Sequence, residues 1–224
     1  MGYKLITVNG GHSEKAPGAG ANGYKEHEYA RMIKDKVVAR LKSVGVKTID
    51  TTSNASTPSA VLAEQAKKCN AQPKGDRLDV SIHLNSGGGT GCEVLYYSEK
   101  TLAAKVSDAI ADEAGWKNRG AKERKELYFL CNTSASAILI EVCFIDSKND
   151  MKILNAKMND IAIAIVKAIT GKSVHVSKPD PKPPKKDEDG LYKVQTGAFK
   201  DKSNAEKLTK ELKKKGISTF ITKE

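Results

Sequence analysis

Hydrophobic and polar positions follow two different periods along the first 170 residues or so. Short apolar or alternating runs, typical of β-strands, are separated by longer segments whose apolar positions recur every three or four residues, as in α-helices. Strands are predicted at 4–8, 46–50, 78–84, 93–97 and 137–144, and helices at 25–44, 58–71, 102–114 and 153–169. The run at 137–144 is the most apolar, which is typical of a strand buried on both faces. This alternation predicts an α/β fold, with a layered, twisted, mainly parallel sheet flanked by helices.

The pattern changes after residue 171. Residues 172–190 hold four prolines among charged residues, a composition typical of a semi-extended linker. The remaining segment predicts a strand at 191–199, a helix at 203–214 capped by Ser203, and a strand at 217–222. We therefore expect a main domain at 1–171, a Pro/Lys-rich linker at 172–190 and a small β-α-β unit at 191–224.

The net charge of +11 divides into +6 for residues 1–172 (25 basic, 19 acidic) and +5 for 173–224 (13 basic, 8 acidic). Such a balance attracts polyanions, either nucleic acid or an anionic bacterial wall. Aromatic residues make up only 5% and the lysines are dispersed among acids, so we expect no nucleic-acid partner. No stretch approaches the ~20 apolar residues that cross a bilayer, and the first residues resemble no secretory signal. We expect synthesis in the cytoplasm without a signal peptide, and no membrane insertion.

The four cysteines, Cys69, Cys92, Cys131 and Cys143, lie far apart and form no C-x-x-C pair. Neither a cysteine zinc site nor a disulfide framework is therefore indicated. We expect all four to be reduced, with Cys143 a core residue.

Two imidazoles and two carboxylates stand where predicted strands or turns end. His12 follows the turn after the first strand, Glu26 begins the first long helix, and His83 ends a middle strand. These side chains can converge across neighbouring strands, because sites of α/β sheets collect at the carboxyl ends of the strands. A His, Glu, His ligand set leaves one position open on a catalytic zinc ion, and Glu141 would be a general base beside it. The set predicts a metal-dependent hydrolase.

Simpler interpretations exist for each ligand candidate. His12 could be an ordinary loop histidine, Glu26 a first-turn carboxylate favoured by the helix dipole, and His83 a core residue. His27 and Glu28 are alternative candidates beside Glu26, although they face other directions on a helix.

Glu141 favours the metal site over these simpler interpretations. It directly follows Ile-Leu-Ile in the predicted interior strand, where a carboxylate is costly to bury unless it is paired or used. The structural alternative is a salt bridge to a buried arginine or lysine.

Several separated motifs carry a family resemblance. They are Gly10-Gly11-His12, Gly18-Ala19, Gly23-Tyr24-Lys25-Glu26, Ser81-Ile82-His83-Leu84-Asn85, Gly91 to Tyr97, Asn118-Arg119-Gly120-Ala121-Lys122, Leu127-Tyr128-Phe129-Leu130 and Ala137 to Val142. In this order, over residues 3–170, the chain resembles the zinc-dependent N-acetylmuramoyl-L-alanine amidases of the amidase-3 type. The resemblance implies Zn²⁺ as cofactor, His12, Glu26 and His83 as its ligands, and Glu141 as the catalytic carboxylate.

One motif departs from the family pattern. The family's opening D-P-G-H-G-G stands here as Asn9-Gly10-Gly11-His12-Ser13-Glu14. This departure concerns the geometry of the loop and leaves His12 itself in place.

The C-terminal segment resembles a SPOR (sporulation-related) peptidoglycan-binding repeat through residues 192–199 and 204–208. Such modules contain two strand-helix-strand halves, and only one half is present. Because so short a unit has few residues for an independent core, we expect a partial SPOR-like unit that could pair between two chains as a homodimer.

The resemblance implies hydrolysis of the amide between N-acetylmuramic acid and L-alanine of bacterial peptidoglycan. The layout is similar to that of a phage endolysin acting on the cell wall after release, and a bacterial autolysin is the alternative origin. Two other functions stay open: a zinc peptidase acting within the peptidoglycan stem peptide, and a non-catalytic wall-binding protein.

Overall fold

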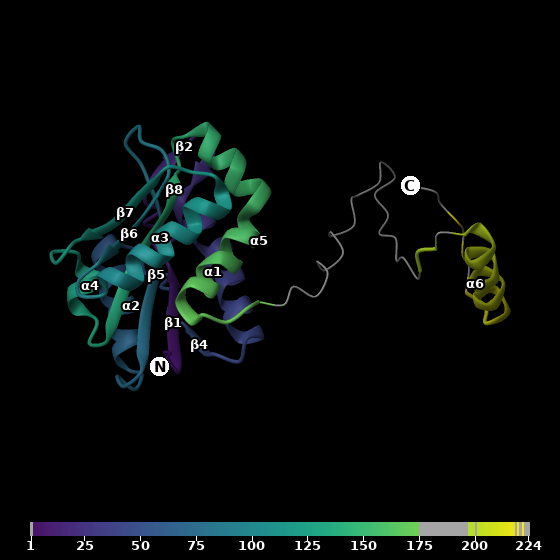
Figure 1. Cartoon of the computed structure of the whole chain (residues 1–224), viewed down its shortest axis with the longest axis horizontal. Helices are drawn as coiled ribbons and strands as arrows, with labels where there is room; N and C mark the ends of the chain where they lie inside the picture. The colour runs from purple at the N-terminus through teal and green to yellow at the C-terminus, as the bar shows by residue number, and fades with distance from the viewer. Residues whose placement is uncertain (1, 175–196, 200, 218, 220, 222–224) are drawn as a thin grey trace. The chain divides into compact units, whose positions relative to one another are not determined.

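The computed structural model describes residues 2–174, 197–199, 201–217, 219 and 221. The chain divides into two compact units, residues 1–175 and 176–224. The first unit contains β1 (Leu5–Gly10), β2 (Gly20–Ala21), β3 (Tyr24–Lys25), α1 (Glu26–Ser43), β4 (Lys47–Asp50), α2 (Pro58–Asn70), β5 (Arg77–Asn85), β6 (Cys92–Tyr96), α3 (Lys100–Ala114), β7 (Asn118–Glu123), α4 (Tyr128–Asn132), β8 (Ser136–Phe144) and α5 (Lys148–Thr170) (Figure 1).

The main sheet has six strands in the order β4-β1-β5-β8-β6-β7. Neighbouring strands from β4 to β8 run parallel, β6 runs antiparallel to β8, and β7 runs parallel to β6. The predicted α/β class with a mainly parallel sheet is confirmed. Because of the reversal, the first residues of β6 and β7 lie at the same edge as the last residues of β1, β5 and β8.

Helices cover both faces of this sheet. The larger core packs α1, α3 and α5 against alternate side chains of the strands, such as Ile6, Val80 and Ile140. A smaller cluster on the other face joins α2 and α4 through Cys69, Phe129 and Leu139. Cys143 lies in the larger core, as predicted, and all four cysteines are free.

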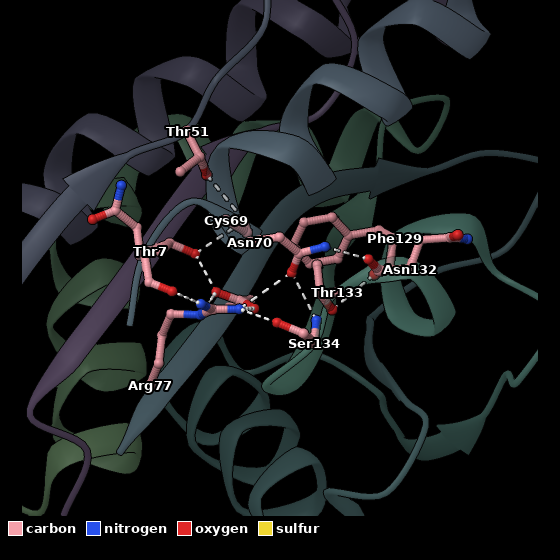
Figure 2. Close-up of polar contacts among 11 residues, drawn as sticks. Thr7, Thr51, Cys69, Asn70, Arg77, Phe129, Asn132, Thr133 and Ser134 are labelled. Atoms are coloured by element: carbon pink, nitrogen blue, oxygen red, sulfur yellow. Dashed lines mark hydrogen bonds and ion pairs between the residues drawn. The ribbon is translucent and has the colours of Figure 1, made fainter. Parts of the chain in front are cut away.

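A polar stripe runs along the face of β5 that α2 covers, because successive side chains of a strand point to opposite faces. At its start Arg77 and Asp79, whose side chains are both 0% exposed, form an ion pair with 2.9 Å between Nε and Oδ1 (Figure 2). Thr7 Oγ1 donates to Asp79 Oδ1 at 2.7 Å, and Arg77 Nη2 donates to Ser134 Oγ at 3.1 Å. Buried charges are tolerated when paired in this way, so this end of β5 is a structural network.

Residues 20–25, between β1 and α1, form a small hairpin. β2 and β3 pair antiparallel around Asn22 and Gly23, whose φ angles are +53° and +81°. Two consecutive positive φ angles match the tight hairpin turn that an Asn-Gly pair favours. The hairpin ends directly at Glu26, the first residue of α1.

Two further elements escaped prediction. β7 has the sequence Asn-Arg-Gly-Ala-Lys-Glu, which shows no apolar alternation, and it forms because it pairs with the edge of β6. The five-residue helix α4 is too short to show a helical period.

In the second unit, the described residues contain the helix α6 (Lys202–Lys214). Its cap is Asp201, so the prediction of Ser203 as the cap is wrong: Ser203 lies inside the helix. The strands predicted at 191–199 and 217–222 and the linker at 172–190 fall largely outside the described residues, and residues 197–199 show no strand. None of the helices in the described part of the chain could cross a membrane.

Candidate metal centre

His12, Glu26 and His83 meet at the carboxyl edge of the sheet. One donor atom from each residue can be chosen so that all three lie within 4.8 Å of one another. His12 Nε2 is 3.2 Å from Glu26 Oε2, and His83 Nδ1 is 3.0 Å from Glu26 Oε1. The two imidazole rings stand edge to face, with centroids 5.0 Å apart. Three residues separated by up to 71 positions therefore form one cluster of metal-ligating atoms.

The loop that carries His12 is held in a restricted backbone conformation. His12 has φ +64°, in the left-handed region that residues other than glycine rarely adopt. A Cβ at Gly11 would lie 2.2 Å from His83 Cε1, and a Cβ at Gly18 would lie 2.5 Å from Glu26 Oε2. Glycine is therefore required at both positions for the loop to close on the ligands. Strain of this kind is concentrated at functional sites.

Backbone amides fix the carboxylate of Glu26. Ala19 N donates to Oε2 at 2.9 Å and Leu84 N donates to Oε1 at 3.2 Å. Burial by itself raises the pKa of Glu26, but hydrogen bonds with His12 and His83 outweigh burial and hold this pKa well below its ordinary value. The carboxylate is thus ionised at neutral pH, which is the state that metal binding needs.

Glu141 lies beside this cluster on β8. It is the register partner of His83 on β5 and of Glu93 on β6. Its Oε2 is buried and has no hydrogen-bond partner among the described residues. Burial, followed by the charges of Glu26 and Glu93, raises the pKa of Glu141 to about 8.

The salt-bridge alternative for Glu141 finds no support in the described part of the chain, where no arginine or lysine pairs with it. Its charged neighbours are themselves carboxylates. A buried carboxyl group with a strongly perturbed pKa and no counter-ion is a candidate for acid or base chemistry.

Sequence reasoning assigned no role to Glu93 and Arg119. Arg119 Nε donates to Glu93 Oε2 at 2.8 Å, and Asn85 Nδ2 donates to Glu93 Oε1 at 3.0 Å. The guanidinium of Arg119 also lies 5.0 Å above the ring of Phe144. Only the antiparallel direction of β6 brings Glu93 to this edge beside Glu141, and the hydrophobic pattern carries no signal for that direction.

The neighbouring candidates His27 and Glu28 do not belong to the cluster. His27 is buried, and its Nε2 lies 4.0 Å from Glu28 Oε1.

Two family models match the chain. The Amidase_3 model, described as N-acetylmuramoyl-L-alanine amidase, matches residues 6–171, and the SPOR domain model matches residues 186–224. The chain therefore belongs to the Amidase_3 family of N-acetylmuramoyl-L-alanine amidases, as its motifs predicted.

Individual relatives agree with this assignment. The endolysin of Bacillus phage SPP1 is 34% identical over 175 residues, which cover 71% of this chain and 62% of that protein. The N-acetylmuramoyl-L-alanine amidase CwlM of Bacillus licheniformis is 27% identical over 227 residues, covering 96% of this chain and 83% of that protein. The solved catalytic domain of the CD27L endolysin targeting Clostridia difficile is 28% identical, with a TM-score of 0.70, and the match covers 77% of this chain and all of that one. This chain thus spans less than two thirds of the SPP1 endolysin.

Proposed function

We propose that this protein is a zinc-dependent N-acetylmuramoyl-L-alanine amidase that hydrolyses the amide between N-acetylmuramic acid and L-alanine of peptidoglycan. The observation that carries the proposal is the cluster of His12, Glu26 and His83 beside the buried, unpaired Glu141. Membership of the Amidase_3 family supports the reaction, and the SPOR match supports peptidoglycan as the polymer bound.

The residues present fit a catalytic zinc ion. Two imidazoles and one carboxylate are a ligand set that leaves a coordination position open. The side chain of Glu26 is 5% exposed and that of His83 is 12% exposed, whereas that of His12 is 29% exposed. The cluster is therefore closed on the side of the sheet and accessible beside His12. Zinc, when bound, supplies a Lewis acid for the scissile carbonyl and lowers the pKa of a water molecule towards ~7.

Glu141 is suited to move the proton in this reaction. As a base, its carboxylate takes a proton from the attacking water, and as an acid it delivers that proton to the departing nitrogen of L-alanine. A group that must both accept and return a proton works best when its pKa lies near the working pH. In the metal-free protein the pKa of Glu141 is about 8, and a bound zinc ion would lower it, which favours the carboxylate that acts as the base.

Digestion of purified cell walls by the zinc-loaded protein, followed by end-group analysis, tests the proposal. We expect new N-terminal L-alanine, with Glu141→Gln as the inactive control that still binds zinc. New D-amino-acid termini would instead identify a peptidase acting within the stem peptide. A zinc-loaded protein that binds walls and releases no termini would be a non-catalytic wall-binding protein.

We further propose that the C-terminal unit binds the bacterial wall and that two chains pair through this unit. The similarity to a phage endolysin supports the cell wall as the place where the enzyme acts. The partial length of the SPOR-like segment supports the pairing. Light scattering of the full chain at micromolar concentration tests it: a dimer is expected, and a monomer would remove the pairing.

A further inference from the structure

A chain of hydrogen bonds leads away from His83 on the side opposite to Glu26. His83 Nδ1 faces Glu26 Oε1 at 3.0 Å, and His83 Nε2 lies 3.1 Å from Ser81 Oγ. Ser81 Oγ in turn donates to Asn9 Oδ1 at 2.7 Å. Ser81 and Asn9 are both 0% exposed. We call this chain, His83 to Ser81 to Asn9, the buried relay.

The direction of the relay follows from a count of protons. A serine hydroxyl carries one hydrogen, and Ser81 gives it to the amide oxygen of Asn9, which can only accept. Towards His83, the hydroxyl therefore presents a lone pair and must receive a proton from Nε2. When Nδ1 binds the zinc ion, the single proton of the neutral imidazole lies on Nε2, the nitrogen that faces Ser81.

We propose that Ser81 and Asn9 are positioning residues, which accept the hydrogen bond of the Nε2 proton of His83 when its Nδ1 binds the zinc ion and keep the ring aimed at that ion. The inference rests on the proposed zinc enzyme and deepens it, because it assigns the ligand atom and the residues that select it. Hydrogen bonds behind a metal-binding histidine commonly fix its tautomer and ring orientation, and losing them costs about 10–100-fold in metal affinity.

The orientation of the Asn9 amide decides whether Ser81 accepts a hydrogen bond from His83 Nε2 or donates one to it. With Oδ1 towards Ser81, Nδ2 is buried and has no partner among the described residues. The reverse orientation would make Nδ2 a donor to Ser81, and Ser81 would then donate to His83 Nε2. The proton of the imidazole would move to Nδ1, and the nitrogen beside Glu26 could not bind a metal.

Zinc affinity, measured by competition with a chromophoric chelator, tests the relay. Ser81→Ala and Asn9→Leu should each weaken zinc binding about 10–100-fold, whereas Asn9→Asp, which keeps an acceptor towards Ser81, should stay within a few-fold of the wild type. Ser107→Ala is the matched control, because Ser107 is also fully buried and its hydroxyl donates to Asn118 Oδ1 at 2.7 Å, outside the relay. Circular dichroism would establish that each variant is folded.

A second measurement reads the tautomer directly. In the zinc-loaded chain labelled with ¹⁵N histidine, His83 should carry its proton on Nε2, and Ser81→Ala should speed the exchange of that proton with water. A proton on Nδ1 of His83 in the zinc-loaded wild type, or unchanged zinc affinity in either Ser81→Ala or Asn9→Leu, would overturn the inference. These outcomes are separate from the reaction: a protein that binds zinc through the relay and releases no L-alanine would contradict the proposed function alone.

Discussion

The charged side chains at the two ends of strand β5 differ in their partners: those at the start form an ion pair, and the carboxyl group beside the other end has no counter-ion among the described residues. At the start of the strand, Arg77 and Asp79 neutralise each other, Thr7 donates a hydrogen bond to Asp79, and Arg77 donates one to Ser134 (Figure 2). At the other end, His83 lies beside Glu141, a partly buried residue whose Oε2 is buried and whose charged neighbours are other carboxylates. The two ends differ in their partners and also in exposure, because the side chains of Arg77 and Asp79 are fully buried, whereas His83, and Glu141 on the neighbouring strand β8, are partly buried.

This difference distinguishes residues that stabilise the fold from residues that we expect to take part in the reaction. A buried ion pair that is broken leaves an uncompensated charge and costs stability. A carboxyl group buried without a counter-ion already carries that cost in the native fold, which supports the proposed role of Glu141 in proton transfer. Substitutions at the Arg77 end should therefore change stability, and those at the Glu141 end should change turnover.

The largest expected effect is on turnover in Glu141→Gln. Losing a general base or acid typically costs about 10²–10⁴-fold in rate. We expect this loss with no fall in thermal stability, because the amide removes a buried group that is costly to ionise. Rates of L-alanine release measure the loss of turnover, and melting curves of the same preparation measure the thermal stability. A variant that keeps full activity would contradict the role of Glu141.

Arg77→Met should lower the stability of the fold and leave zinc binding unchanged. Removing one partner of a buried pair is expected to lower the free energy of unfolding by about 3–5 kcal/mol, since Asp79 is left without its counter-ion. Urea denaturation measures the loss. Zinc affinity of the folded fraction should be unchanged, and a variant as stable as the wild type would show that this pair is not a structural element.

Zinc should stabilise the folded chain by binding to His12, Glu26 and His83 at the carboxyl end of β5. A ligand present at about 100 times its dissociation constant adds about 2.7 kcal/mol to the free energy of unfolding. We expect zinc to raise the melting temperature, a chelator to reverse the rise, and His12→Ala to abolish it. Unfolding curves recorded with and without zinc give the comparison. An equal rise in His12→Ala would place the ion elsewhere.

The last expected difference concerns pH in the metal-free protein, and its size depends on how much of the pH window is sampled. The pKa of Glu141 is about 8 in the fold against an ordinary 4.5, so between these values the unfolded chain releases a proton that the folded chain retains. Stability should therefore fall as pH rises through this window, by at most about 1.4 kcal/mol per pH unit. The opposite shift of Glu26 acts only below its ordinary pKa. Denaturation midpoints in this window should fall less steeply in Glu141→Gln, and parallel profiles would contradict the assignment.

The hydrophobic pattern was sufficient to predict the four parallel strands and five of the helices, because their periods are strong. It was also sufficient to single out His12, Glu26 and His83 as residues that the sheet could bring together. The structure places their donor atoms in one cluster.

Other features depend on pairing that no local pattern encodes. The direction of β6 brings Glu93 to the site, and the register between β1 and β5 sets Asn9 opposite Ser81. The interpretation of Glu141 needed both its burial and its neighbours, and sequence supplied only the burial. The cap of α6 was displaced by two residues, since Asp201 and Ser203 are both acceptable cap residues.

The most direct test of the account is anomalous diffraction at the zinc edge from crystals of the full chain grown with zinc. We predict one strong peak coordinated by His12 Nε2, a carboxylate oxygen of Glu26 and His83 Nδ1, with Glu141 beside the open position. A peak at other residues, or none at this cluster, would contradict the division of β5 into a structural end and a catalytic end.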